Sequence, residues 1–119
     1  MKRKIDITVG SVSGTLERFE RVWRQAESGK IGLTETRLTF ESLPLLLKNL
    51  TPARWTLLEA VKRSGPMSIS RLASLLGRNY KNVHTDVKRL AELGLIERRA
   101  DQRIAVVWDT ITAEMKLVA

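Results

Sequence analysis

The stretch NYKNVHTDVKRLAELGLIERR, residues 79–99, joins an apolar helical stripe to a cluster of polar side chains and the only histidine of the chain. Val83, Val87 and Leu90 fall within roughly 60° of one another when each residue is advanced by about 100°, which predicts one buried helix face. Gly94 predicts the end of this helix, because glycine readily adopts the left-handed conformation found after helix C-termini. The stretch therefore predicts a helix that packs on one side and is exposed on the other.

The outward face of the predicted helix carries basic and hydrogen-bonding side chains. Within about 55° of the direction opposite the apolar stripe lie Arg78, Lys81, Thr85, Lys88 and Arg89. Asn82 and His84 lie on the flanks, and Tyr80 lies near the edge of the apolar side. Arginine and lysine bind guanine edges or phosphates, asparagine binds adenine, and threonine contacts phosphate or the thymine methyl group. This face can therefore contact DNA, and a solvated helix surface of average charge is the alternative.

Two further helices are expected upstream of this one. Thr51-Pro52 predicts a helix start, with threonine as N-cap and proline at the first helical position. The helix ARWTLLEAVKR (53–63) would bury Trp55, Leu57, Leu58 and Val61. The following unit, SISRLASLLG (68–77), has apolar residues at helical spacing and ends at Gly77. Only a short turn separates it from the helix of residues 79–93.

A β-hairpin is expected immediately after the third helix. The runs LIERR (95–99) and RIAVVW (103–108) flank a short polar turn. The order helix, helix, tight turn, helix, hairpin is typical of the winged helix-turn-helix, whose second helix of the pair enters the DNA major groove. The sequence therefore predicts this fold for residues 51–119.

Arginines gather around the tip of the expected hairpin, where a wing meets the minor groove or the phosphates. A solvated hairpin end is the alternative reading of the same residues. The complete predicted DNA-binding surface is Arg78, Asn79, Tyr80, Lys81, Asn82, His84, Thr85, Lys88, Arg89, Arg98, Arg99 and Arg103. The remaining arginines and lysines of residues 51–77 are interpreted as phosphate or solvent contacts and not as specificity residues.

Residues 1–50 are expected to form a strand-helix-strand-helix extension. Ile5, Ile7 and Val9 alternate as in a half-buried strand, and residues 12–28 have helical apolar spacing. Residues 36–41 alternate again, and the apolar run SLPLLLKNL (42–50) predicts a short helix whose leucines we assign to the core. Residues 111–119 are a further strand or a loose tail. The predicted fold class is therefore α+β, with domains at 1–50 and 51–119.

The charge of the chain favours a polyanionic partner. The 119 residues carry a net charge of +8. Residues 62–89 hold seven basic side chains against the single acid Asp86, a net charge of +6. Clustered positive charge favours a polyanion or an acidic membrane as partner, and a small protein that is merely basic is the alternative. The basic segment is not one long amphipathic helix, which argues against a membrane-surface role.

Other function classes have little support in the sequence. One histidine, no cysteine and no catalytic spacing argue against an enzyme, a metal site or a bound cofactor. His84 could instead supply a pH-sensitive contact. No apolar run approaches the roughly 18–20 residues of a membrane span, and the N-terminus lacks the apolar core of a signal peptide. We therefore expect a cytoplasmic protein.

Two strings carry a resemblance to a known family. LTPARWTLL (50–58) and LGRNYKNVHTDVKRLAELGLIE (76–97) resemble the winged-helix core of MarR-like transcriptional regulators. The resemblance is closest to short bacterial and archaeal regulators with a β-α-β N-terminal part, and it is most specific from Thr51 to about Trp108. It implies a homodimeric repressor or autoregulator that binds double-stranded DNA. Because such genes often neighbour small toxin-like genes, it also implies an antitoxin with a toxin protein as partner.

The N-terminal extension is the expected dimerisation region, because the chain has no room for the long terminal helices of larger MarR proteins. The rival interpretation is a winged-helix module that docks a partner protein without binding specific DNA. Its candidate surfaces are the helix SLPLLLKNL and the face around Trp23, although we assign both to the core. Dependence of binding on salt and on DNA sequence would separate the two interpretations.

Overall fold

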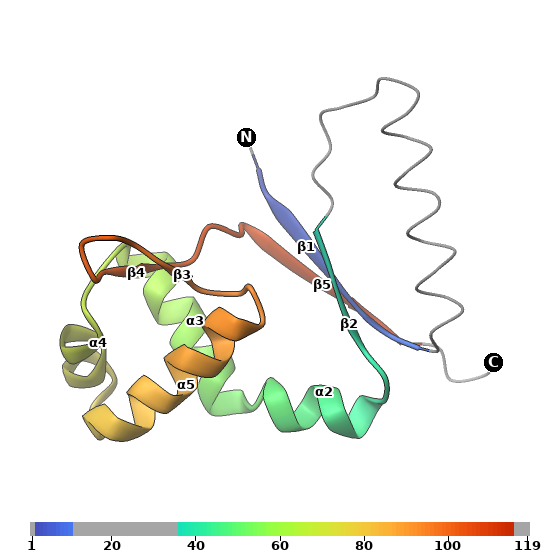
Figure 1. Cartoon of the computed structure of the whole chain (residues 1–119), viewed down its shortest axis with the longest axis horizontal. Coiled ribbons are helices and arrows are strands. Elements are labelled where there is room, and N and C mark those ends of the chain that lie inside the picture. Colours follow the sequence, from blue (N-terminus) through green and yellow to red (C-terminus); the bar gives the residue numbers. More distant parts are fainter. Residues whose placement is uncertain (1, 11–35, 116–119) are drawn as a thin grey trace. The chain divides into compact units, whose positions relative to one another are not determined.

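The computed structural model describes residues 2–10 and 36–115 of the chain, which divides into two compact units (Figure 1). Unit 1 comprises Met1–Lys48 and Asp109–Ala119, and unit 2 comprises Asn49–Trp108. The helix expected over residues 12–28 lies outside the described residues. The architecture is mixed α+β, as the sequence predicts. No helix of the described residues is both long and apolar enough to cross a lipid bilayer.

Unit 1 contains a three-stranded parallel sheet in the order β2-β1-β5 (Figure 1). Its strands are β1 (Lys4–Val9), β2 (Thr36–Phe40) and β5 (Thr110–Glu114). Ile7 pairs with Leu38 on one side and with Ala113 on the other, and it is buried. The two strands expected in the N-terminal part are thus confirmed. Thr110–Glu114, in the segment expected to be a further strand or a loose tail, form the third strand of this sheet and group with unit 1.

The expected short helix is present as α2 (Leu43–Asn49), but most of its leucines are not buried. Leu46 is buried, whereas Leu43, Leu45 and Leu47 are 39%, 40% and 59% exposed. The assignment of these three leucines to the core was therefore wrong. A seven-residue helix with leucines on every side can turn only one side inward, which leaves the rest exposed.

Unit 2 contains three helices that begin where the sequence predicts. They are α3 (Pro52–Ser64), α4 (Ile69–Leu76) and α5 (Tyr80–Glu92). Each has a side-chain N-cap: the side chains of Thr51, Ser68 and Asn79 accept hydrogen bonds from backbone N–H groups of the first turn. α4 ends at Gly77, whose φ of 62° lies in the left-handed region. Only three residues separate α4 from α5, so the turn is tight.

The core of unit 2 is formed by the inward faces of these helices and by the residues that follow α5. Val83, Val87 and Leu90 are fully buried, which confirms the predicted apolar stripe. Their neighbours in the core include Leu57, Leu58, Val61, Leu72, Leu95 and Ile104. Trp55 was expected among them, but it is 42% exposed. α4 contacts both α3 and α5, so the third helix rests on a packed pair.

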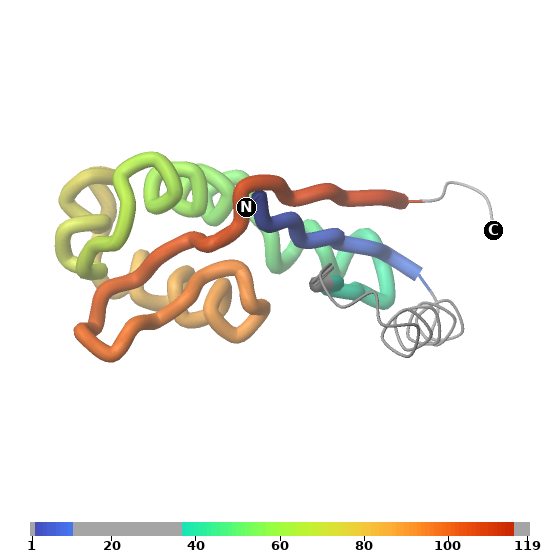
Figure 2. The backbone as a smooth tube through the Cα atoms, turned by 90° about the horizontal axis from the view of Figure 1, so that it is seen from above, coloured from blue at the N-terminus to red at the C-terminus, as the bar shows by residue number. Residues whose placement is uncertain are grey.

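The expected hairpin follows α5 and consists of β3 (Glu97–Arg98) and β4 (Ile104–Ala105), which are antiparallel. Figure 2 traces it as the orange-to-red loop that leaves the end of α5 and returns. Ile104 also exchanges backbone hydrogen bonds of 3.1 and 2.8 Å with Met67, the residue just before the α4 N-cap. At its base, Trp108 Nε1 donates to the Gly94 carbonyl oxygen at 2.9 Å. The hairpin is thus fixed to the start of α4 and to the end of α5.

Candidate nucleic-acid interface

The outward side of α5 presents four polar side chains to solvent. Lys81, Thr85 and Lys88, predicted on the outward face, and Asn82, predicted on its flank, are all exposed. The Thr85 hydroxyl donates to the Lys81 carbonyl oxygen at 3.0 Å, which holds that side chain against its own helix. No acidic residue lies in the first turn of α5. The positive end of the helix dipole therefore adds to the charge of Lys81 in the first turn.

The aromatic residues expected beside this face lie next to each other. Tyr80 is 51% exposed and His84 is half-buried. The centroids of their rings are 6.0 Å apart, with the ring planes tilted by 38°. Tilted aromatic pairs at this separation are weakly attractive, so the two rings fix each other's position along the flank of α5.

Asn79 is the N-cap of α5, which gives it a structural role that the sequence prediction did not include. Its Oδ1 accepts from the backbone N–H groups of Lys81 at 2.8 Å and of Asn82 at 3.4 Å. The amide NH₂ group stays on the surface, because the residue is exposed. Asn79 can therefore donate to a ligand only with that NH₂ group while its oxygen caps the helix.

Arg78 is held by an ion pair within unit 2. Its Nη2 lies 2.7 Å from Asp86 Oδ2, and Arg54 Nε lies 3.0 Å from Asp86 Oδ1. The side chain of Asp86 is only 14% exposed, and that of Arg54 is 17% exposed. A single half-buried carboxylate thus accepts from two arginines, one on α3 and one in the turn before α5.

Arg89 is also bound within the protein. Its Nε donates to Asn49 Oδ1 at 2.7 Å, and its Nη1 lies 3.1 Å from Glu92 Oε2. Asn49 is buried, and its carbonyl oxygen accepts from Arg54 Nη1 at 2.9 Å. Of the five residues predicted on the outward face, Arg78 and Arg89 therefore have their guanidinium groups turned to partners in unit 2, while the other three are free of ion pairs among the described residues.

The hairpin tip carries the three predicted arginines, all exposed. Arg99 Nε lies 3.9 Å from Glu97 Oε2, and Arg103 Nε lies 3.8 Å from Asp101 Oδ2. Such long, exposed ion pairs contribute about 1 kcal/mol at most and are screened by salt. The arginines of the tip are therefore available to a polyanion.

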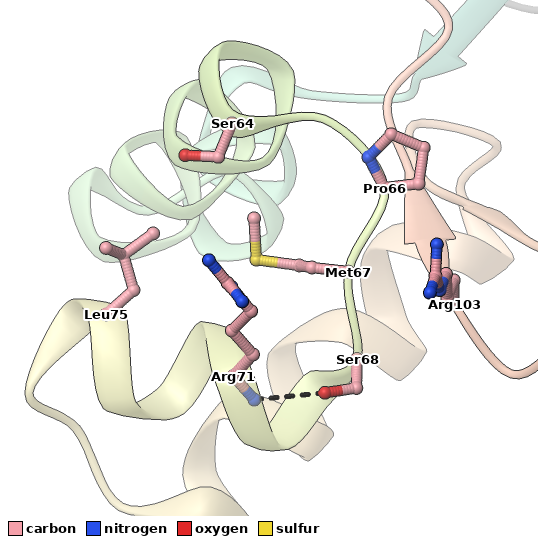
Figure 3. A pocket seen from close by; sticks show the side chains of 7 residues that line it. All are labelled: Ser64, Pro66, Met67, Ser68, Arg71, Leu75 and Arg103. Carbon is pink, nitrogen blue, oxygen red and sulfur yellow. Dashed lines mark hydrogen bonds between the residues drawn. The ribbon is translucent and has the colours of Figure 1, made fainter.

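A hollow of about 470 Å³ lies where the end of α3, the segment before α4 and the first turns of α4 meet (Figure 3). Arg71 and Arg103 contribute the charged groups of its lining, which contains no acidic residue. In Figure 3 the Arg71 side chain extends beside Met67, while Arg103 lies on the other side of the Pro66–Ser68 segment. The two guanidinium groups do not converge on one point, so the hollow is a basic surface depression and not a built anion site.

Sequence reasoning missed the hydrogen-bonded cluster of Asn49, Arg54 and Asp86, in which Asn49 is buried and the other two are partly buried. One signal was available, because Asp86 is the only acid in the strongly basic stretch 62–89. A lone acid among cations is often an ion-pair partner, although the sequence does not say whose. No group of three or more His, Cys, Asp or Glu side chains that could hold a metal ion occurs in the described part of the chain.

Residues 49–113, more than half of the chain, match the sequence model of the HVO_A0114 family. The chain belongs to the HVO_A0114 family. The region shared with the HVO_A0114 family begins at the first residue of unit 2 and runs through the hairpin into β5. No curated protein and no solved structure matches the chain. Membership of the HVO_A0114 family assigns no activity, and the resemblance to MarR-like regulators stays a prediction.

Proposed function

We propose that this HVO_A0114 family member binds double-stranded DNA sequence-specifically through a winged helix-turn-helix formed by unit 2. The observation that carries the proposal is the division of α5 into two faces. Val83, Val87 and Leu90 are buried, while Lys81 and Lys88 are exposed on the other side together with Asn82 and Thr85. Because the buried face packs in the core, the backbone of α5 is already ordered before binding, and this lowers the entropy cost of presenting its polar side chains.

The order of elements in unit 2 supports the helix-turn-helix part of the proposal. α4 and α5 are joined by three residues and contact each other, and α3 supports α4. In a helix-turn-helix the second helix enters the major groove with its N-terminal residues near the bases. The 13 residues of α5 extend about 20 Å, so the helix is longer than the major groove is wide, at about 12 Å.

The hairpin after α5 supports the proposal that unit 2 has a wing. It is fixed at one end by the Met67–Ile104 pairing and at the other by the Trp108–Gly94 hydrogen bond, so its tip has a defined place beside α4 and α5. Arg98, Arg99 and Arg103 on the tip would contact phosphates or the minor groove. Arg71, which lines the hollow beside the start of α4, would add a further phosphate contact.

The chemistry of each side chain on α5 indicates whether it would contact bases or phosphates. Asn82 can make a bidentate contact to adenine, and the Thr85 methyl group can contact thymine. Lys81 and Lys88 can bind guanine edges or phosphates. Arg78 and Arg89 are not included among the DNA contacts, because their guanidinium groups are bound to Asp86, Asn49 and Glu92.

Dimerisation, repression, autoregulation and a role as an antitoxin with a toxin partner rest on the resemblance to MarR-like regulators. For a two-fold symmetric dimer, the bound site would be near-palindromic, with half-sites about one helical turn apart. Measuring the mass of the protein alone and bound to DNA tests this part of the proposal. A monomer on an asymmetric site would rule it out while leaving DNA binding intact.

Docking of a partner protein without specific DNA binding is the second candidate function. It is favoured by one observation, the exposure of Leu43, Leu45 and Leu47 on α2. At about 100° per residue, Leu43 and Leu47 lie on one side of α2 and Leu45 on the other, so Leu43 and Leu47 form the candidate apolar surface. The same leucines would also suit a dimer interface, so they do not by themselves argue against DNA binding.

Selection of bound duplexes from a random DNA pool, with the purified full chain at about 0.15 M salt, tests the proposed function. We expect a recurrent motif to be enriched and to bind about 10³-fold or more tightly than a scrambled duplex. Enrichment of no motif, with equal affinity for both duplexes, would reject specific binding and favour the docking module.

A further inference from the structure

We propose that Asp86 is a specificity-determining positioning residue, which holds Arg54 and Arg78 inside unit 2 and thereby keeps two arginines away from the DNA backbone. This inference rests on the proposed DNA binding and concerns how that binding is made selective. Asp86 itself touches no base in this account. It acts through the two arginines and through the position of α5.

Three elements of unit 2 meet at the Asp86 carboxylate. Asp86 belongs to α5, Arg54 to the first turn of α3, and Arg78 to the turn between α4 and α5. Arg54 Nε donates to Oδ1 at 3.0 Å and Arg78 Nη2 donates to Oδ2 at 2.7 Å, so each carboxylate oxygen has its own arginine. Charge-assisted hydrogen bonds of this length are among the strong ones in proteins. The carboxylate thus fastens α5 to α3 at the point where the tight turn leads into α5.

Both arginines face the protein and not the solvent. The Arg78 side chain is 29% exposed, and its Nη1 is enclosed without a hydrogen-bond partner among the described residues. Arg54 is held from two directions, because its Nη1 also donates to the Asn49 carbonyl oxygen at 2.9 Å. By contrast, Lys81 and Lys88 are exposed on the same helix and make no ion pair in the described part of the chain. The lysines on the exposed face of α5 are therefore available to DNA, whereas Arg54 and Arg78 are bound to Asp86.

This separation matters because phosphate contacts carry no sequence information. Each arginine or lysine that neutralises a phosphate tightens binding to every duplex and steepens its salt dependence. Arg78 stands immediately before the first turn of α5, next to the side chains proposed to read bases. If it were released, it would add a contact of this non-selective kind. Its retention by Asp86 keeps the contribution of the bases large relative to that of the backbone.

Replacement of the carboxylate by an amide releases the two arginines. In Asp86→Asn the two guanidinium groups lose their shared anion, and two unpaired cations so close together would repel each other. We expect Arg78 to turn outward, and the scrambled duplex to be bound more tightly as a result. The slope of log K against log salt should become steeper by about 1 to 2. Affinity for the selected duplex should not gain equally, because α5 is no longer fastened to α3.

The test compares the full-length wild type with Asp86→Asn, Asp86→Glu and Glu59→Gln. Glu59 is an exposed acid of α3, so Glu59→Gln makes the same change in net charge without releasing an arginine. Affinities for the selected and scrambled duplexes are measured at several salt concentrations. We expect the ratio of the two affinities to fall about tenfold or more in Asp86→Asn, to change little in Glu59→Gln, and to be largely restored in Asp86→Glu.

Two outcomes overturn the inference, and they have different meanings. If the wild type does not distinguish the two duplexes, the proposed DNA function fails and the inference fails with it. If the wild type is selective but Asp86→Asn behaves like Glu59→Gln in both the affinity ratio and the salt slope, only the role of Asp86 is rejected.

A second pair of variants keeps the test informative if Asp86→Asn unfolds. Arg78→Gln leaves the Arg54–Asp86 ion pair in place, and Lys88→Gln removes a cation that is exposed. Lys88→Gln should make the salt slope shallower by about 0.9 if Lys88 binds a phosphate. Arg78→Gln should change the slope by less than half as much, even where it weakens binding by loosening α5. A slope that becomes shallower by about 0.9 in Arg78→Gln would show that Arg78 binds a phosphate and would overturn the inference.

Discussion

The N-cap of α5 gives a prediction whose size follows from the structure. Asn79 Oδ1 accepts from the N–H groups of Lys81 and Asn82, at the second and third positions of the helix. Asn79→Ala removes this acceptor and leaves both donors to water, which costs about 1 kcal/mol, within a range of roughly 0.5–2. Unit 2 contains the 60 residues from Asn49 to Trp108. For a domain of that size, 1 kcal/mol lowers Tm by about 4–8 °C.

Thermal unfolding followed by circular dichroism measures this effect, with Asn79→Ser as the matched control. Serine is as good an N-cap as asparagine, because its hydroxyl oxygen can accept the same hydrogen bonds. We expect Asn79→Ser to stay within about 2 °C of the wild type, and Asn79→Ala to melt several degrees lower. An unchanged Tm in Asn79→Ala, or an equal loss in both variants, would show that the cap does not stabilise α5.

Two further predictions separate the exposed from the buried side of α5. Lys88→Ala should leave Tm nearly unchanged, because the side chain is exposed, but should weaken DNA binding and make its salt slope shallower by about 0.9. Fluorescence anisotropy at several salt concentrations measures this, and an unchanged slope would remove Lys88 from the phosphate contacts. Val87→Asp should unfold unit 2, because it places an unpaired carboxylate in a fully buried position. A native far-ultraviolet circular dichroism spectrum and a cooperative melt for this variant would contradict the packing of α5.

The elements of unit 2 could be predicted from the sequence because their signals are local. Thr51 caps α3 as predicted, and the apolar periodicity of each segment lies within the helix that the structure shows. The helical repeat of apolar residues is enough to predict the buried stripe of α5. Two β-rich runs and the short turn between them are enough to predict the hairpin. Each of these features depends on residues within about a dozen positions of one another.

The features that could not be predicted depend on distant residues. Arg54 meets Asp86 across 32 positions, and Arg89 meets Asn49 across 40. No local pattern records which arginine a carboxylate will bind, so Arg78 and Arg89 were placed with the DNA contacts on helical angle alone. β5 pairs with β1 from the opposite end of the chain, and its alternation was too weak to indicate a partner. In each case the tertiary packing within one unit, and not the local sequence, decides which residues make contact.

The most direct measurement of the central claim is an NMR titration of the isotope-labelled protein with a duplex enriched by selection. We expect backbone amide shifts to concentrate on residues 80–88 of α5 and on residues 98–103 of the hairpin tip. Shifts concentrated on α2, or no shifts at a saturating concentration of the duplex, would contradict the assignment of α5 as the helix that reads DNA.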